Sequence, residues 1–290
     1  MEGADLVAAG IAAGHRPQVV FVRQGSAAEV AAAGGAAGGG AGEAVKPAAL
    51  AGLTVYALTE RVAAKVSTLE TAPDVMAVFP LPARLPLEAL RGGATPTAGG
   101  RPPALGPLVV YADGVGDPGN MGTLLRAAAA FGAAALAAAP GSVDLYAPKT
   151  VRASMGAVFA LPLYQGLRLA DLKARLGVER VYGLVAHGGS PLAEADLRRP
   201  TVLCVGAERA GLAPETLAHV THPLTIELGP GGAGAGTTGA LPPGVESLNA
   251  GVAGAIALYE FARRERAAAH GAAARSGGVA GHAGPAPGKG

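Results

Sequence analysis

Two short segments in the C-terminal half of the chain combine glycines with polar side chains, a pattern typical of ligand-binding loops. Residues 205–212 read VGAERAGL and continue a strand-like run, residues 201–205. A strand that ends in glycine places bare backbone at the C-terminal edge of a parallel sheet, where open α/β sheets bind ligands. Residues 246–254 read ESLNAGVAG and open a helix, which Ser247 can cap. The two segments predict a pocket made of loops and a helix N-terminus, not of metal ligands.

A third segment, residues 117–126, reads DPGNMGTLLR and adds groups that can stabilise charge. The guanidinium of Arg126 holds its proton firmly, so it is a poor general base but a good donor to a phosphate or a developing alkoxide. Asn120 and Asn249 offer amide hydrogen bonds to Arg126 or to a substrate, and Glu208 offers a carboxylate that could pair with Arg126. Each also has a structural explanation: asparagine caps helices, and charged side chains cover surfaces.

In this order, the three segments resemble the three motifs of the SpoU–TrmH family of RNA 2′-O-ribose methyltransferases, within the SPOUT superfamily. The resemblance covers residues 108–266. It implies a trefoil-knotted, parallel-sheet methyltransferase domain of the α/β class, which forms a homodimer with the active site near the interface. It also implies transfer of a methyl group from S-adenosyl-L-methionine to an RNA ribose, with ribosomal RNA as the favoured substrate.

The same resemblance assigns roles to individual residues. The implied catalytic residues are Asn120, Arg126, Glu208, Ser247 and Asn249. The implied cofactor contacts, largely through backbone, are Gly206, Ile226 and Leu248. Arg152, in an Arg-x-Ser-x-Gly-Ala pattern, joins Arg126 as a candidate contact to RNA phosphates. Glu227 and Leu228 stand where the family commonly has Pro-Met, and the Gly-rich residues 229–244 lengthen the following loop. These departures from the family pattern put the affinity for the cofactor in question.

The composition limits the classes of protein that fit. The 290 residues are enough for one large or two ordinary domains, and a net charge of +2 excludes a general basic field. Cys204 is the single cysteine, which excludes an internal disulfide and a cysteine-cluster metal site. No apolar run is long enough to span a membrane, and the first residues match no signal or transit pattern. We therefore expect an intracellular, soluble protein of the cytoplasm or an organelle matrix, with no metal.

Strand-like and helix-like patterns alternate through the second part of the chain. Strands are expected at residues 108–111, 133–138, 158–164, 181–186, 201–205 and 224–228, and helices at residues 120–131, 149–155, 169–176, 214–220 and 247–266. This alternation predicts a parallel α/β sheet covered on both faces. The last helix carries an apolar stripe, which we expect at the dimer interface or against its own sheet: Val252, Ile256, Ala257 and Phe261.

Residues 1–90 predict a small α/β unit that resembles the RNA-binding domain found N-terminal to many members of the family. The family usually has a strand before the Glu2-Gly3 pair, so we expect this unit to be truncated at its N-terminus. Residues 91–107 are rich in Gly, Pro and Thr and predict a linker. Residues 267–290 predict a disordered tail, and we expect the linker, the tail and residues 229–244 to be mobile.

Three alternatives remain open. The chain could be an inactive RNA-binding or ribosome-assembly paralogue, although the retained polar residues argue against it. It could act on transfer RNA. A dinucleotide oxidoreductase would also suit a parallel sheet, but the chain lacks a Gly-x-Gly-x-x-Gly turn after the first strand of the large domain. The sequence names neither the nucleotide nor the role of Arg126 as base or electrostatic stabiliser.

Overall fold

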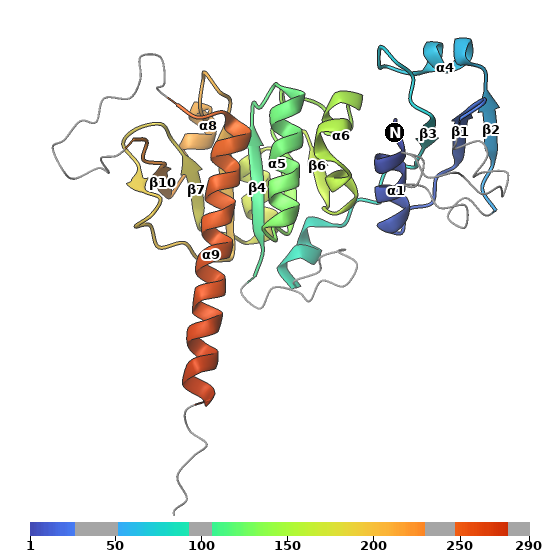
Figure 1. Ribbon diagram of the computed structural model, residues 1–290. Coiled ribbons are helices and arrows are strands. Elements are labelled where there is room, and N and C mark those ends of the chain that lie inside the picture. Colours follow the sequence, from blue (N-terminus) through green and yellow to red (C-terminus); the bar gives the residue numbers. More distant parts are fainter. Residues whose placement is uncertain (27–51, 93–105, 230–246, 278–290) are drawn as a thin grey trace, which may run out of the picture.

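The computed structural model describes residues 1–26, 52–92, 106–229 and 247–277. Two α/β units lie beside each other, a small one near the N-terminus and a large one that holds the rest (Figure 1). Within the described residues, no helix combines the length and the apolar character that a membrane span requires. Most of the predicted linker, nearly all of residues 229–244 and the end of the predicted tail lie outside the described residues.

Seven strands form the sheet of the large unit, and every paired neighbour is parallel. Their order is β6 (Leu163–Gln165), β5 (Ala135–Ala138), β4 (Leu108–Asp113), β9 (Thr201–Gly206), β7 (Val181–Leu184), β10 (His222–Thr225) and β8 (Ser190–Pro191). The central strand β4 is buried along its whole length, as expected for a strand covered on both faces. The predicted parallel α/β sheet is confirmed, while the trefoil knot stays a prediction.

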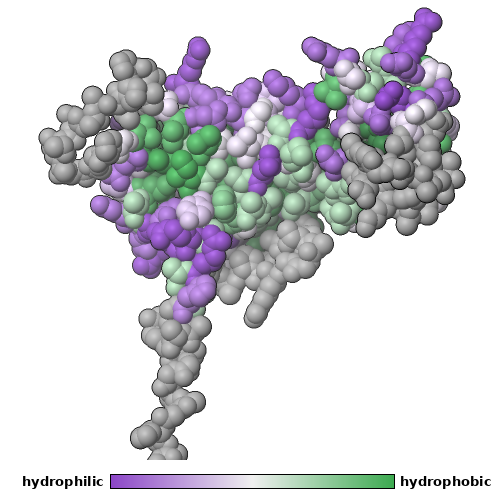
Figure 2. Space-filling view, in the orientation of Figure 1, coloured by the Kyte–Doolittle hydropathy of each residue, from purple (hydrophilic) through white to green (hydrophobic). Residues whose placement is uncertain are grey.

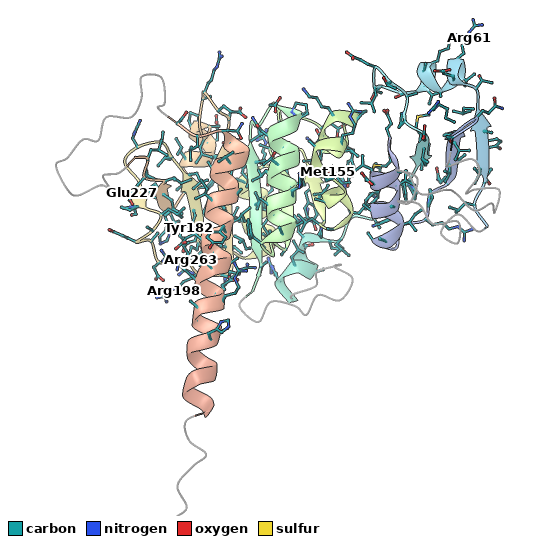
Figure 3. All side chains as sticks on the ribbon, viewed as in Figure 1. Arg61, Met155, Tyr182, Arg198, Glu227 and Arg263 are labelled. Atoms are coloured by element: carbon teal, nitrogen blue, oxygen red, sulfur yellow. The ribbon has the colours of Figure 1, made fainter. Side chains whose placement is uncertain are left out.

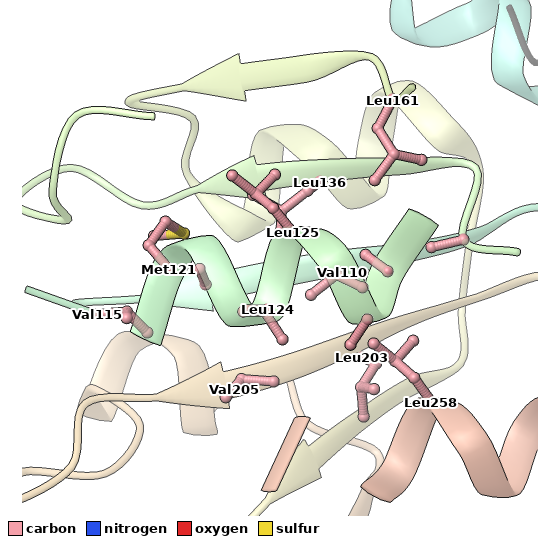
Figure 4. Close-up of a cluster of buried hydrophobic side chains, with 14 of the residues drawn as sticks. Val110, Val115, Met121, Leu124, Leu125, Leu136, Leu161, Leu203, Val205 and Leu258 are labelled. Carbon is pink, nitrogen blue, oxygen red and sulfur yellow. The ribbon is translucent and has the colours of Figure 1, made fainter. Parts of the chain in front are cut away.

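Helices cover both faces of this sheet. One face carries α5 (Pro118–Ala130), α6 (Pro148–Ser154) and α9 (Ala250–Gly277); the other carries α7 (Leu169–Leu176) and η1 (Leu87–Gly92). Alternate residues of β4 point to opposite cores, so Val110 meets α5 while Val109 lies on the α7 side. In Figure 4, Leu124 and Leu125 of α5 lie over the strands, and Leu258 of α9 joins them.

Small residues let the three helices of the first face pack closely. A Cβ atom at Gly122 of α5 would lie 2.7 Å from the Ala153 carbonyl carbon of α6. On the other side of α5, a Cβ atom at Gly251 of α9 would lie 2.9 Å from the Asn120 carbonyl oxygen. The glycine at position 251 therefore lets the first turn of the last helix lie close to the backbone of α5.

In its described residues, the small unit shows a three-stranded sheet and two helices: α1 (Ala4–Ala12), β1 (Val19–Arg23), β2 (Val55–Leu58), α4 (Glu60–Val66) and β3 (Val75–Val78). β1 lies in the middle, parallel to β2 and antiparallel to β3. The two units are in contact, because Leu6 of α1 is buried in the large core and Gly156 faces Ala9. Arg152 donates a hydrogen bond of 2.7 Å to the Thr68 hydroxyl and lies 3.8 Å from the Glu2 carboxylate.

Two predicted elements were wrong in extent or type. The last helix begins at Ala250 and continues to Gly277, so the predicted disorder is wrong for residues 267–277. This stretch is rich in alanine, the strongest helix former. Its low sequence complexity led instead to the prediction of disorder. The predicted strand at residues 158–164 is instead the short helix η2 (Ala157–Phe159) followed by β6. A short apolar run does not by itself distinguish a helix from a strand. Here Gly156, with a φ of 90°, turns the chain directly before η2.

The close packing of α5 on α6 generates a stability prediction. Gly122→Ala places a methyl group against the α6 backbone, and we expect it to lower the free energy of unfolding by about 1–3 kcal/mol, as overpacking of a filled core does. Gly116→Ala is the matched control, because a Cβ atom there meets nothing closer than 4.0 Å. Urea unfolding of both variants would measure the difference, and equal midpoints would contradict this account of the packing.

Candidate functional site

A cavity of about 460 Å³ opens at the C-terminal ends of β7, β9 and β10. Parallel strands all end at the same edge, so loops from distant parts of the sequence meet there. The start of α9 and the short helix α8 (Pro214–Leu217) supply further walls. The size is within the range of about 300–1,000 Å³ that is usual for small-molecule sites.

The loop after β9 forms much of this cavity. Its ends are joined by two reciprocal hydrogen bonds between Ala207 and Gly211, of 3.0 and 2.9 Å. The loop folds back so tightly that a Cβ atom at Gly206 would lie 2.5 Å from the Leu212 nitrogen. No side chain fits at Gly206, and the cavity wall here is therefore largely backbone.

The three predicted cofactor residues, Gly206, Ile226 and Leu248, all line this cavity. Two of the predicted catalytic residues, Glu208 and Ser247, line it as well. The structure thus brings the second and third sequence segments together around one space. Their roles in binding stay predictions.

Sequence reasoning missed the contribution of β7. Residues 184–187, which end and follow this strand, line the cavity, and His187 among them is exposed. The sequence feature that could have indicated this contribution is the Gly188-Gly189 pair, which closely follows the strand-like run of residues 181–186. The other loops of the site were expected at the same edge of the sheet. Among the described residues, no group of three or more His, Cys, Asp or Glu side chains could hold a metal ion.

A chain of hydrogen bonds joins all three segments beside the cavity. The Asn249 side-chain amide donates to the Asn120 Oδ1 atom at 2.6 Å, and the Asn120 amide donates to Glu208. Asn249 Oδ1 also accepts from the Val252 backbone at 3.1 Å and so caps α9. The prediction that Ser247 caps this helix is wrong, because the helix begins three residues later. Glu208 is bound to Asn120 and forms no ion pair with Arg126 in the described part of the chain.

The two predicted RNA-contacting arginines lie outside the cavity. Arg126 is exposed on α5, and its guanidinium forms no hydrogen bond or ion pair with any residue that the structure describes. Arg152 is engaged by Thr68 and Glu2 of the small unit. The Arg152 guanidinium is already bonded to the small unit, whereas that of Arg126 is bonded to none of the described residues and can offer its donors to a phosphate. Arg126 is therefore the better candidate for an RNA contact.

Tyr111 of β4 and Cys204 of β9 are buried in the core on the α7 side of the sheet. Burial, and then the negative charge of Asp113, raise the pKa of Tyr111 to about 12. The same two causes raise the pKa of the fully buried Cys204 thiol. Cys204 is therefore a buried structural thiol, and a nucleophilic role for it is excluded.

Comparison with known proteins gives a consistent result. The sequence model of the SpoU rRNA Methylase family matches residues 107–234. The 23S rRNA (guanosine(2553)-2′-O)-methyltransferase of Bacillus subtilis is 31% identical over 213 residues, which cover 72% of this chain and 73% of that protein. A TrmH-family structure from Porphyromonas gingivalis has a TM-score of 0.63 and 30% identity, covering 91% of this chain and 89% of that one.

A rRNA methyltransferase from Sinorhizobium meliloti, solved with AdoMet bound, has a TM-score of 0.65 and 25% identity, covering 91% of this chain and 86% of that one. The chain covers 57% and 38% of the length of two Synechocystis relatives that are described as tRNA/rRNA methyltransferases. The similarity therefore extends through nearly the whole fold, while some relatives are considerably longer.

The hydrogen-bond chain generates a prediction about the loop after β9. Glu208→Ala removes the acceptor of the Asn120 amide, and we expect a loss of about 0.5–1.5 kcal/mol of stability, the usual value of one hydrogen bond. Glu208→Gln keeps an oxygen in place and should lose less. Thermal unfolding of the two variants would measure this, and a Gln variant as unstable as the Ala variant would argue against the bond to Asn120.

Proposed function

Because this chain belongs to the SpoU rRNA methylase family, we propose that it is an S-adenosylmethionine-dependent RNA 2′-O-ribose methyltransferase that acts on ribosomal RNA. The observation that carries the proposal is the meeting of the three sequence segments at one sheet edge, around a cavity with backbone walls. The relatives named as 23S rRNA 2′-O-methyltransferases favour ribosomal over transfer RNA. Mapping the ribose methylations that disappear from a strain lacking this protein would test the substrate.

The cavity residues fit the cofactor. Gly206 leaves room for close backbone contact, and Ile226 and Leu248 offer apolar surface to an adenosine. The Glu208 carboxylate lines the same cavity and would attract a cationic group such as the sulfonium of this cofactor. When bound, S-adenosylmethionine supplies an electrophilic methyl group and needs no metal. The chain's own residues then have to position the ribose and ease the loss of its 2′-hydroxyl proton.

Arg126 is the residue that we assign to the RNA. It lies on α5, whose N-terminus carries Asn120 at the edge of the site, and it is free to bind a phosphate or a developing alkoxide. The Asn249–Asn120–Glu208 chain fixes the start of α5 relative to the cofactor loop. The arrangement separates a cofactor side, built from backbone, from an RNA side, built from a guanidinium.

We further propose a homodimer through the face formed by α5 and α9. The predicted apolar stripe is divided: Ala257 and Phe261 are buried in the protein's own core, whereas Val252 is 43% exposed and Ile256 37%. Tyr259 is 47% exposed and extends the exposed part. Figure 2 shows hydrophobic surface over the upper part of α9 and beside it. Covering this surface with a second copy would also enclose Arg126, which is exposed on the neighbouring helix.

The small unit would extend the RNA contact. Its helix α4 exposes Arg61 and Lys65, and Arg61 projects from the outer end of the unit (Figure 3). Because the net charge of the chain is only +2, such local groups have to supply the attraction to phosphates. Arg152 would contribute by holding the small unit in a fixed place.

We expect Arg126→Ala to reduce the rate of methyl transfer strongly while leaving the affinity for the cofactor unchanged. Removal of a donor to a developing oxyanion costs about a hundredfold to a thousandfold in rate, and Arg126→Lys should recover little of it. Gly206→Val should instead prevent cofactor binding, because its side chain collides with the Leu212 backbone. Calorimetry with S-adenosylmethionine and a tritium-methyl assay on deproteinised RNA would separate the two effects.

Arg168→Ala is the control for this experiment, since Arg168 is exposed at the start of α7 on the opposite face of the sheet. It should retain activity. Retained activity in Arg126→Ala, or loss of cofactor binding together with activity, would show that the assigned roles are wrong.

The proposed interface predicts that Ile256→Glu converts a dimer to a monomer. A carboxylate at the centre of an apolar contact would be desolvated without a partner. Val66→Glu introduces the same charge at an exposed residue of α4 and should leave the dimer intact. Light scattering at micromolar concentration would measure the molecular mass of both variants and of the unmodified protein. An unmodified protein that is a monomer would disprove the dimer.

A further inference from the structure

Asp113, the last residue of β4, is a buried carboxylate for which the proposed reaction has no role. It is only 6% exposed. Its Oδ2 atom accepts a hydrogen bond of 2.7 Å from the backbone nitrogen of Ala213. Ala213 directly precedes α8 and is the residue at which the loop after β9 ends. Ala213 has no side-chain group that could cap α8. The acceptor for its backbone N–H is instead Asp113, which lies one hundred residues earlier in the sequence.

The loop that Asp113 holds is the one that shapes the cavity. Its start is fixed by β9, where Gly206 pairs with Asp113 in the sheet register. Its middle is fixed by the bond from Asn120 to Glu208, at the edge that faces the proposed RNA site. Its end is fixed by Asp113, on the buried side. Neither residue of the last attachment, Asp113 or Ala213, lines the cavity itself.

We propose that Asp113 is a positioning residue for the cofactor, which holds the end of the loop between Gly206 and Ala213 and so keeps the cavity in its binding shape. The inference rests on the proposed function of this cavity. A hydrogen bond that a carboxylate accepts is stronger than one between neutral groups, and a buried N–H without a partner is costly. Loss of the carboxylate therefore releases the loop end while the β9 end and the Glu208 contact remain.

The test compares variants of both partners in the full chain. Asp113→Ala removes the acceptor, and we expect it to raise the Kd for S-adenosylmethionine about tenfold, with little change in the KM for RNA. Asp113→Asn keeps an oxygen at the same place and should recover most of the affinity. Ala213→Pro removes the donor at a φ of −62°, which proline adopts, and should weaken binding similarly. In the double variant Asp113→Ala, Ala213→Pro, the two losses should not add.

Asp144→Ala is the matched control. Asp144 also accepts a hydrogen bond from a backbone nitrogen, that of Tyr146 at 2.9 Å, but it holds no residue of the loop after β9. It should bind S-adenosylmethionine like the unmodified protein.

Amide hydrogen exchange of the cofactor-free chain gives a readout that does not depend on activity. Asp113→Ala should speed exchange selectively in residues 207–213. Unchanged exchange there, an unchanged Kd in Asp113→Ala, or a uniform rise in exchange across the large unit would overturn the proposal. If the unmodified protein binds no S-adenosylmethionine, the proposed function fails, while selective loop exchange would still establish the positioning of the loop. If Asp113→Ala does not fold, Ala213→Pro decides the question, because an unchanged Kd in that variant would also overturn the proposal.

Discussion

The site depends on a backbone contact that excludes side chains. At Gly206 the chain leaves β9, and the loop returns so closely that a Cβ atom would lie within 2.5 Å of the Leu212 nitrogen. The strand before it is buried between β4 and β7, so its end cannot shift to make room. The loop must therefore fold around a glycine, and its backbone becomes the cavity wall. A site formed in this way gains its specificity from the position of peptide groups, not from a set of reactive side chains.

Polar side chains then set the positions of the elements around that wall. Asn249 caps α9, Asn120 receives its amide and donates to Glu208, and Asp113 holds the far end of the loop. Each bond joins segments that are far apart in sequence, so the segments must fold together to satisfy them. The amide and carboxylate groups that sequence motifs present as catalytic are here largely occupied with one another. Arg126 differs from them because it is exposed and makes no hydrogen bond or ion pair with a described residue, which suits the RNA contact that we propose for it.

The sequence predicted the parts of this structure that local patterns encode. Buried apolar runs such as residues 201–205 identified the central strands, and glycine after such a run located the cavity at Gly206. Contacts across the fold left no local signal: Asp113 reads as one carboxylate in a turn-rich segment, and only the three-dimensional structure places it against Ala213. The two-residue strand β8 is too short to show a period, and the stripe on α9 is divided between buried residues such as Phe261 and exposed ones such as Val252, which helical spacing alone does not distinguish. The helix beyond Arg266 was missed because a run of alanines favours helix and low complexity equally.

The long Gly-rich insertion need not weaken the cofactor site. Its two flanks, Leu228 on one side and Ser247 with Leu248 on the other, both line the cavity. Leu228 follows the strand β10, and Leu248 precedes the cap at Asn249, so each flank is attached to a fixed element. The entropy of closing a loop grows only with the logarithm of its length, about 0.6 kcal/mol for each doubling. An insertion between two anchored ends therefore adds a modest folding cost and leaves the cavity walls in place. Of the two residues that depart from the family pattern, Leu228 lines the cavity, so we expect its effect on affinity to come from the shape that it gives the wall, and not from slack passed on from the insertion.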